Sequence, residues 1–164
     1  MGKVTSYTEL TAPVSGDKFP VIDVSDTSQA ATGSTKWMTG SVLHNYIAKE
    51  RVYSYPGTLV TGTGTVRMYF MRTATLFNIA IMVSTAPTGT GSIVVDVNKN
   101  GTTIFNPTAK PEIAISGFTN LTNVPDVTAV SAGQYLTIDI DDVGGTIAGS
   151  DLTVVVEYHE DPAS

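Results

Sequence analysis

Four aspartates near the C-terminal end of the chain have the types and spacing most suited to chemistry: Asp139, Asp141, Asp142 and Asp151. Asp139 and Asp141 lie two residues apart in a segment of alternating apolar and polar residues, so on a strand both carboxylates would face water from one side. Carboxylate oxygens are the ligands that Ca²⁺ prefers, which makes Asp139, Asp141 and Asp142 candidate calcium ligands. The alternative is that these outward carboxylates prevent edge-to-edge association of strands.

The remaining polar residues do not have the spacing of a catalytic or cofactor site. The chain has no cysteine, no G-x-S-x-G segment and only two histidines, His44 and His159, both of which we expect to be solvated. The glycine-rich turns at 62–64 and 89–91 lead into predicted strands, whereas a phosphate-binding loop leads into a helix. We therefore expect no cofactor and no enzymatic activity.

Tyrosines at predicted strand positions are candidates for ligand binding of another kind. Tyr53, Tyr55, Tyr69 and Tyr135 could form a sugar-binding platform, because aromatic ring faces stack on sugars and the hydroxyl groups can form hydrogen bonds with them. The alternative is that these rings fill the rim of the fold or a subunit interface. The sequence leaves both interpretations open.

The composition argues against several partners. Charged residues make up 15% of the 164 residues, and 9 lysines and arginines against 15 acidic residues give a net charge of −6 without a basic cluster. A protein that binds the phosphate backbone needs local positive charge, so we expect no nucleic-acid partner. The apolar stretches are too short to cross a membrane, and the N-terminus has no apolar signal-peptide core, so we expect no membrane association.

Residues 1–50 differ in pattern from residues 51–164. The first part contains a short extended segment at 19–24 and, after a polar loop, a predicted helix of two or three turns around 42–47. The apolar residues of this helix fall on one face: Val42, Leu43, Tyr46 and Ile47. Because so short a helix is not stable alone, we expect residues 1–50 to form an anchoring segment that docks on another surface.

Residues 51–164 consist of short strand patterns separated by turn residues. The pattern predicts strands at 52–55, 65–72, 76–84, 92–98, 102–106, 112–116, 127–130, 134–143 and 152–158. The residues predicted to face inward are Val66, Met68 and Phe70, then Phe77, Ile79, Ile81 and Val83, then Ile93, Val95 and Val97, and finally Leu136, Ile138 and Ile140. Asn100-Gly101 between two of these strands is typical of a tight hairpin turn. Such spacing indicates a mainly β fold, an antiparallel β-sandwich of about eight strands.

Two parts of the chain resemble virion proteins of tailed bacteriophages. One is the N-terminal segment T-E-L-T-A-P-V-S-G-D-K-F-P-V-I-D followed by T-K-W-M-T-G-S-V-L-H-N-Y-I, which is similar to a module near the N-termini of fibre and head-appendage proteins. The other comprises V-D-V-N-K-N-G-T-T-I-F and Q-Y-L-T-I-D-I-D-D-V-G-G-T-I-A-G-S-D-L-T-V-V-V-E-Y, which resemble the jelly-roll domains of such proteins.

The resemblance implies a jelly-roll sandwich in a structural protein of the virion. It implies a homotrimeric capsid decoration, or cement, protein that binds the major capsid protein of the assembled head, with the sandwich displayed outside. The residues expected to contact the head or a neighbouring subunit are Phe19, Val21, Trp37, Leu43, Tyr46 and Ile47. The alternative is a short tail or neck fibre whose sandwich recognises glycans on the host surface.

Overall fold

The computed structural model of the chain describes residues 18–23, 34–39 and 47–160. The chain divides into two compact units. The first includes the strands β1 (Lys18–Asp23) and β2 (Ser34–Thr39), and the second, Ala48–Asp161, holds the strands β3 to β12. Within the residues described, no helix is long and apolar enough to span a membrane.

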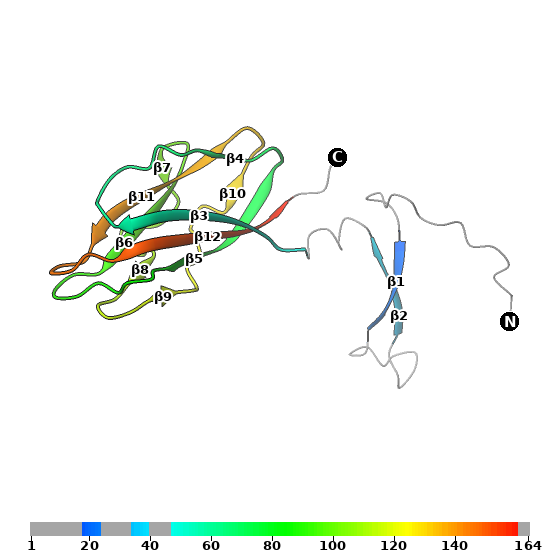
Figure 1. Cartoon of the computed structure of the whole chain (residues 1–164). Helices are drawn as coiled ribbons and strands as arrows, with labels where there is room; N and C mark the ends of the chain where they lie inside the picture. The colour runs from blue at the N-terminus through cyan, green and yellow to red at the C-terminus, as the bar shows by residue number, and fades with distance from the viewer. Residues whose placement is uncertain (1–17, 24–33, 40–46, 161–164) are drawn as a thin grey trace, which may run out of the picture. The chain divides into compact units, whose positions relative to one another are not determined.

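Strands β1 and β2 form an antiparallel hairpin (Figure 1). The register places Phe19 opposite Met38, Pro20 opposite Trp37 and Val21 opposite Lys36. The first strand agrees with the extended segment predicted at 19–24, whereas the second was not predicted. The helix predicted at 42–47 falls almost wholly on residues 40–46, which lie outside the described residues, and Ile47 belongs to no helix or strand.

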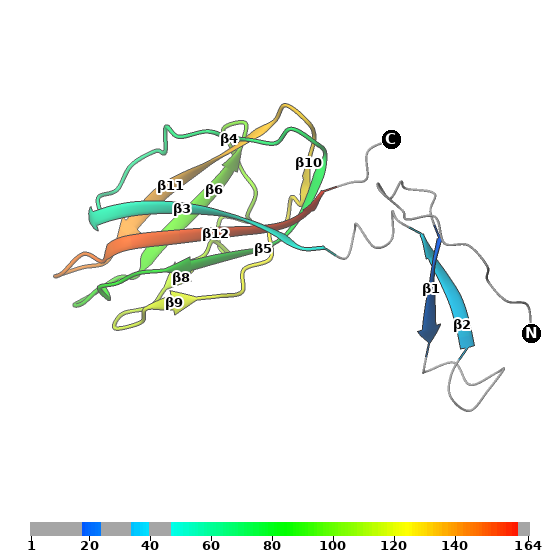
Figure 2. The ribbon, with the colours of Figure 1, turned by 45° about the vertical axis from the view of Figure 1, so that its right-hand side comes forward.

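The second unit is built from ten strands in two antiparallel sheets. These strands are β3 (Lys49–Thr58), β4 (Met68–Tyr69), β5 (Ala74–Met82), β6 (Ile93–Lys99), β7 (Thr102–Thr103), β8 (Glu112–Ile113), β9 (Thr119–Asn120), β10 (Ala129–Val130), β11 (Tyr135–Val143) and β12 (Ser150–Glu160). One sheet has the order β10-β5-β12-β3 and the other β4-β11-β6-β7. Figures 1 and 2 show the two sheets as the layers of a sandwich.

The ten strands occupy eight positions. Strand β9 pairs with the same side of β5 as β10 does, and β8 pairs with the same side of β6 as β7 does. Along the chain, successive positions alternate between the two sheets except at β6 and β7, which form a hairpin within one sheet. This is the connectivity of a jelly roll. The prediction of a mainly β antiparallel jelly-roll sandwich is therefore confirmed.

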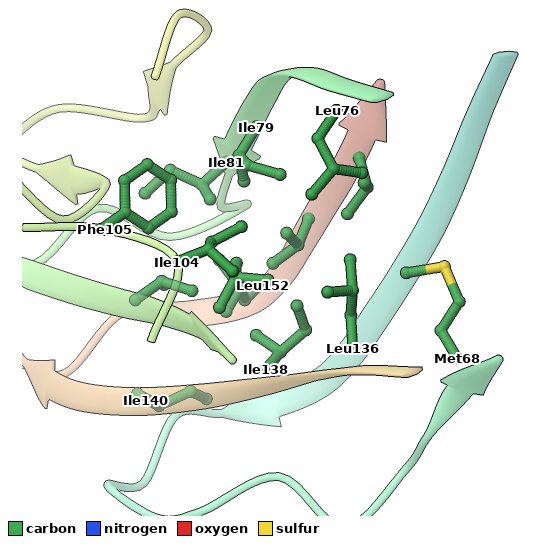
Figure 3. Packing of buried hydrophobic residues seen from close by; sticks show 14 of the residues in the cluster. Met68, Leu76, Ile79, Ile81, Ile104, Phe105, Leu136, Ile138, Ile140 and Leu152 are labelled. Atoms are coloured by element: carbon green, nitrogen blue, oxygen red, sulfur yellow. The ribbon is translucent and has the colours of Figure 1, made fainter. Parts of the chain in front are cut away.

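The hydrophobic core lies between the two sheets. Ile93, Val95 and Val97 of β6 are wholly buried, as are Leu136 and Ile138 of β11. Figure 3 shows side chains from both sheets meeting in this space. Period-2 alternation therefore predicted the inner faces of β6 and β11 correctly, because each strand has one face on the core.

The predicted turn at Asn100-Gly101 is also confirmed. It joins β6 to β7, and both residues have positive φ angles, 50° and 85°. This is the backbone of a type I′ turn, whose twist matches that of the paired strands, and Asn and Gly tolerate it at the least steric cost.

Two predicted inner rows are wrong in part. In the predicted strand 65–72 only Met68–Tyr69 is strand, and Val66 is exposed while Met68 and Phe70 are buried. In β5 the register with β12 shifts at Phe77, so that the buried residue there is Leu76 and Phe77 is only half-buried. A β-bulge puts two residues of one strand against one of its partner, which local alternation cannot reveal.

Candidate functional site

The predicted virion contacts are distributed over two parts of the chain. Phe19 and Val21 lie on β1 and Trp37 lies on β2, where it is opposite Pro20. Leu43 and Tyr46 lie outside the described residues. Ile47, which directly precedes the second unit, is 53% exposed.

The predicted calcium ligands do not converge on one point. Asp139 Oδ1 accepts a hydrogen bond from the Gly64 amide at 2.8 Å, and Oδ2 accepts one from Asn98 Nδ2 at 2.9 Å. Asp142 Oδ1 instead accepts hydrogen bonds from the backbone amides of residues 143 and 144. The loop that contains Gly64 crosses Asp139 and half-buries it. The expectation that Asp139 faces open water is therefore wrong.

Asp141 belongs to a different cluster, centred on Lys110. The Lys110 ammonium lies 2.6 Å from Asp141 Oδ2 and 2.8 Å from Oδ2 of the buried Asp96. The Thr103 hydroxyl donates a 2.6 Å hydrogen bond to the other oxygen of Asp96. Asp96 lies directly opposite Asp139 in the sheet, where two like charges repel, and the lysine offsets that repulsion.

Lys110 is thus the cation that the carboxylates of Asp96 and Asp141 share. The hydrogen bonds to Asp141 and Asp96 raise the pKa of Lys110, because both favour the charged ammonium. Among the residues described, no group of three or more histidines or acidic residues is placed to hold a metal ion. Sequence reasoning missed Lys110 because it lies in a loop far from these aspartates along the chain.

Asp151, the fourth candidate aspartate, closes a turn at the start of β12. Its Oδ1 accepts a 2.8 Å hydrogen bond from the Gly57 amide, and Oδ2 accepts one from the Ser150 hydroxyl at 2.9 Å. These two bonds lower the pKa of the Asp151 carboxyl. The carboxylate therefore holds the end of β3 against β12.

His159 is not solvated as predicted. Its ring stacks on that of Phe77, with centroids 4.6 Å apart and planes 25° apart. Nδ1 is buried without a hydrogen-bond partner in the part of the chain that the structure describes. The other histidine, His44, lies outside the described residues.

The four candidate tyrosines separate into two pairs with different environments. Tyr53 and Tyr55 on β3 pack against the core, and their hydroxyls donate hydrogen bonds to the carbonyls of Leu136 (3.4 Å) and Ile138 (3.2 Å). Burial raises the pKa of Tyr53 to about 12 and also raises that of Tyr55. This pair closes the rim between the two sheets, as the structural interpretation predicted.

Tyr69 and Tyr135 form the second pair, on the surface. Their ring centroids are 5.4 Å apart, and Tyr69 is 46% exposed. The Arg67 guanidinium lies 4.5 Å from the centroid of the Tyr135 ring. Tyr69 and Arg67 are exposed and Tyr135 is half-buried, so a ligand can reach this side of the pair.

The rim of the sandwich also contains a pocket of about 250 Å³. It is lined by Tyr55, Pro56, Thr58, Leu59, Val60, Thr61, Gly62, Thr63, Gly64, Ile138 and Ile140. None of these residues is a carboxylate, histidine, lysine or arginine, and Tyr55 supplies the one ionisable side chain in this lining. Gly64 approaches β11 so closely here that a Cβ atom would lie 1.9 Å from the Ile138 carbonyl oxygen.

Comparison of the chain with protein-family models, with curated proteins and with solved structures finds no match.

Proposed function

We propose that this protein is a non-enzymatic structural protein of a phage virion, a decoration protein that binds the assembled head through its N-terminal segment. The observation that carries the proposal is the β1–β2 hairpin, which belongs to a compact unit distinct from the sandwich. A two-stranded hairpin is at best marginally stable in water, so it gains stability by packing on a partner surface. The resemblance of this segment to fibre and head-appendage modules is the reason for proposing the virion as that partner.

The hydrogen bonds and ion pairs of four aspartates support a role without catalysis. Asp96, Asp139, Asp141 and Asp151 each have a partner within the sandwich. A catalytic acid or base must keep an available site for the substrate proton. These four carboxylates instead join strands and loops, which suits a scaffold that presents surfaces.

An exposed apolar segment supports association between copies of the chain, which the resemblance implies is trimeric. Large apolar side chains recur at every third position along the segment that contains β9: Ile115, Phe118, Leu121, Val124 and Val127 are 40–67% exposed. Residues 115–127 contain a single charged residue, Asp126. Exposed apolar surface with little charge is typical of subunit interfaces, and we propose that a second copy of the chain covers this segment.

Trimeric association would strengthen binding to a symmetric shell. Three hairpins on one particle act at a high effective concentration, so weak individual contacts give a stable complex. A protein that binds only the assembled shell also stabilises that shell by mass action.

The experiment is to mix the purified full-length protein with heads that lack it and to locate it by sedimentation and electron microscopy. We expect binding at regular positions over the shell. Binding only at the tail vertex, or only to host cells, would contradict decoration and favour a short tail or neck fibre.

A further inference from the structure

Three surface side chains form a cluster where β4 pairs with β11. Tyr69 lies directly opposite Tyr135 in the register, and their ring planes are tilted by 57°. The Arg67 guanidinium stacks on the Tyr135 ring at 4.5 Å, and its Nη1 lies 3.5 Å from the Tyr69 hydroxyl. The guanidinium therefore lies over the Tyr135 ring with one nitrogen near the Tyr69 hydroxyl.

The cluster leaves most of its binding groups open to solvent. Arg67 is exposed, and in residues 47–160 the ion pairs to carboxylates are made by Lys49 and Lys110, not by Arg67. A guanidinium carries five N–H donors, and the contact with Tyr69 engages one nitrogen. Tyr69 itself is 46% exposed. A forked cationic donor and an aromatic ring thus lie side by side on the surface.

A second arginine fixes the backbone of this cluster. Arg51 Nη1 donates a 3.0 Å hydrogen bond to the Tyr69 carbonyl, and Arg51 Nε donates one of 3.1 Å to the Tyr158 hydroxyl. The Arg51 guanidinium also lies 5.0 Å from the centroid of the buried Phe70 ring. These contacts join β4 to β3 and β12 and so hold the backbone of Tyr69 in place, which lowers the entropic cost of binding at that residue.

We propose that Arg67, Tyr69 and Tyr135 form a binding site for a sugar that carries a carboxylate group. The planar guanidinium matches a carboxylate with two parallel hydrogen bonds, and stacking on Tyr135 leaves its N–H edge free for them. The exposed Tyr69 ring offers an apolar face to the pyranose ring, which a bare phosphate or sulfate would not use. The chain's net charge of −6 opposes indiscriminate binding of polyanions, so recognition depends on this local geometry. The inference is independent of the head-binding role.

The test is a calorimetric or NMR titration of the full-length protein with trigalacturonate. The fully methyl-esterified trisaccharide and dextran sulfate are titrated in parallel. We expect the carboxylate form to bind and the ester to bind at least about tenfold more weakly, because the ester loses the charge-assisted hydrogen bonds. Equal binding of the ester, equal binding of dextran sulfate, or no binding of trigalacturonate at about 10 mM would overturn the proposal.

Three substitutions at exposed positions separate the site from general electrostatics. Arg67→Gln should weaken binding about tenfold, whereas Arg72→Gln removes the same charge from another exposed arginine and should change it less than about twofold. Tyr69→Thr, which keeps a strand-forming residue, should also weaken binding through loss of the ring face. Thermal unfolding of each variant verifies that it is folded. Equal effects of the two arginine substitutions, or full affinity in Tyr69→Thr, would contradict the site.

Discussion

The backbone of Gly64 lies against the carbonyl oxygen of Ile138, so that a Cβ atom at residue 64 would come within 1.9 Å of that oxygen. The Gly64 amide also donates a hydrogen bond to Asp139 Oδ1. The loop after β3 can therefore follow the edge of β11 only with a glycine at this position. This contact closes one side of the sandwich and forms part of the wall of the rim pocket.

The first prediction concerns this close contact. Gly64→Ala should lower the free energy of unfolding by about 1–3 kcal/mol, because either the loop or β11 must move to accommodate the methyl group. Gly62 of the same loop is the matched control, since a Cβ atom there would meet nothing within 4 Å. Gly62→Ala should change stability by less than about 0.5 kcal/mol. Chemical denaturation measures both, and equal values for the two variants would show that the loop does not depend on the contact.

The second prediction concerns the Lys110 cluster. Lys110→Met removes the cation between Asp96 and Asp141. Among residues 47–160, the buried Asp96 carboxylate then keeps the Thr103 hydroxyl as its one side-chain partner. We expect a loss of about 1–3 kcal/mol in the free energy of unfolding. Lys99→Met is the control, because the Lys99 ammonium donates to the exposed Ala129 carbonyl instead of pairing with a buried carboxylate. If Lys110→Met is no more destabilising than Lys99→Met, the cluster does not stabilise the fold.

The same cluster has a predictable pH dependence. The pKa of Lys110 is higher in the folded protein than in the unfolded chain, where it is about 10.4. The stabilisation by the Lys110 ammonium is therefore fully present below about pH 10.4 and is lost as the pH rises through the pKa of Lys110 in the folded protein. The stability difference between the wild type and Lys110→Met should therefore be constant from pH 7 to 9 and shrink above about pH 10. Denaturation curves at several pH values test this, and a difference that grows with alkaline pH would contradict it.

A third prediction concerns Tyr53. Burial raises the pKa of its phenol to about 12. The unfolded phenol ionises near pH 10, so between about pH 10 and 12 the unfolded state loses protons that the folded state keeps, and stability falls. Tyr53→Phe removes this titration and should show a shallower loss of stability over that range. The measurement is the free energy of unfolding at alkaline pH, and identical slopes for wild type and variant would contradict burial as the cause.

A fourth prediction concerns the exposed apolar segment around β9. Light scattering should give the mass of a trimer for the wild type, and Phe118→Ser together with Leu121→Ser should shift the protein toward a monomer, because both side chains are more than half exposed. Thr119→Ser in the same segment is the control. A monomeric wild type, or a trimer unaffected by the double substitution, would contradict this interface.

The sequence predicted those parts of the fold whose causes are local. Alternation predicted the buried faces of β6 and β11, and Asn100-Gly101 predicted the turn between β6 and β7. Alternation failed at Phe77, because the bulge there depends on the pairing of β5 with β12. It also failed to predict β2, which contains polar residues and has no regular apolar period.

The site residues depend on contacts that are distant along the chain. Asp139 was expected to face water, but the loop at Gly64 covers it, and Lys110 reaches Asp141 from a separate loop. Tyrosine positions were visible in the sequence, whereas the division into rim and surface pairs follows from the packing of β3 and β4 against β11. The stacking of Arg67 on Tyr135 likewise depends on the register between β4 and β11.

The head-binding role of the hairpin is tested most directly by disrupting β1 in the full-length protein. Neighbouring residues of a strand direct their backbone amides to opposite sides, so one of Val21 and Ile22 donates a hydrogen bond to β2. Proline has no amide hydrogen, so Val21→Pro together with Ile22→Pro removes that bond whichever of the two residues donates it. Ile22→Val is the control. We predict that the double-proline variant no longer co-sediments with heads while its sandwich unfolds at the wild-type temperature, and that Ile22→Val binds normally. Undiminished head binding by the double-proline variant would contradict the account.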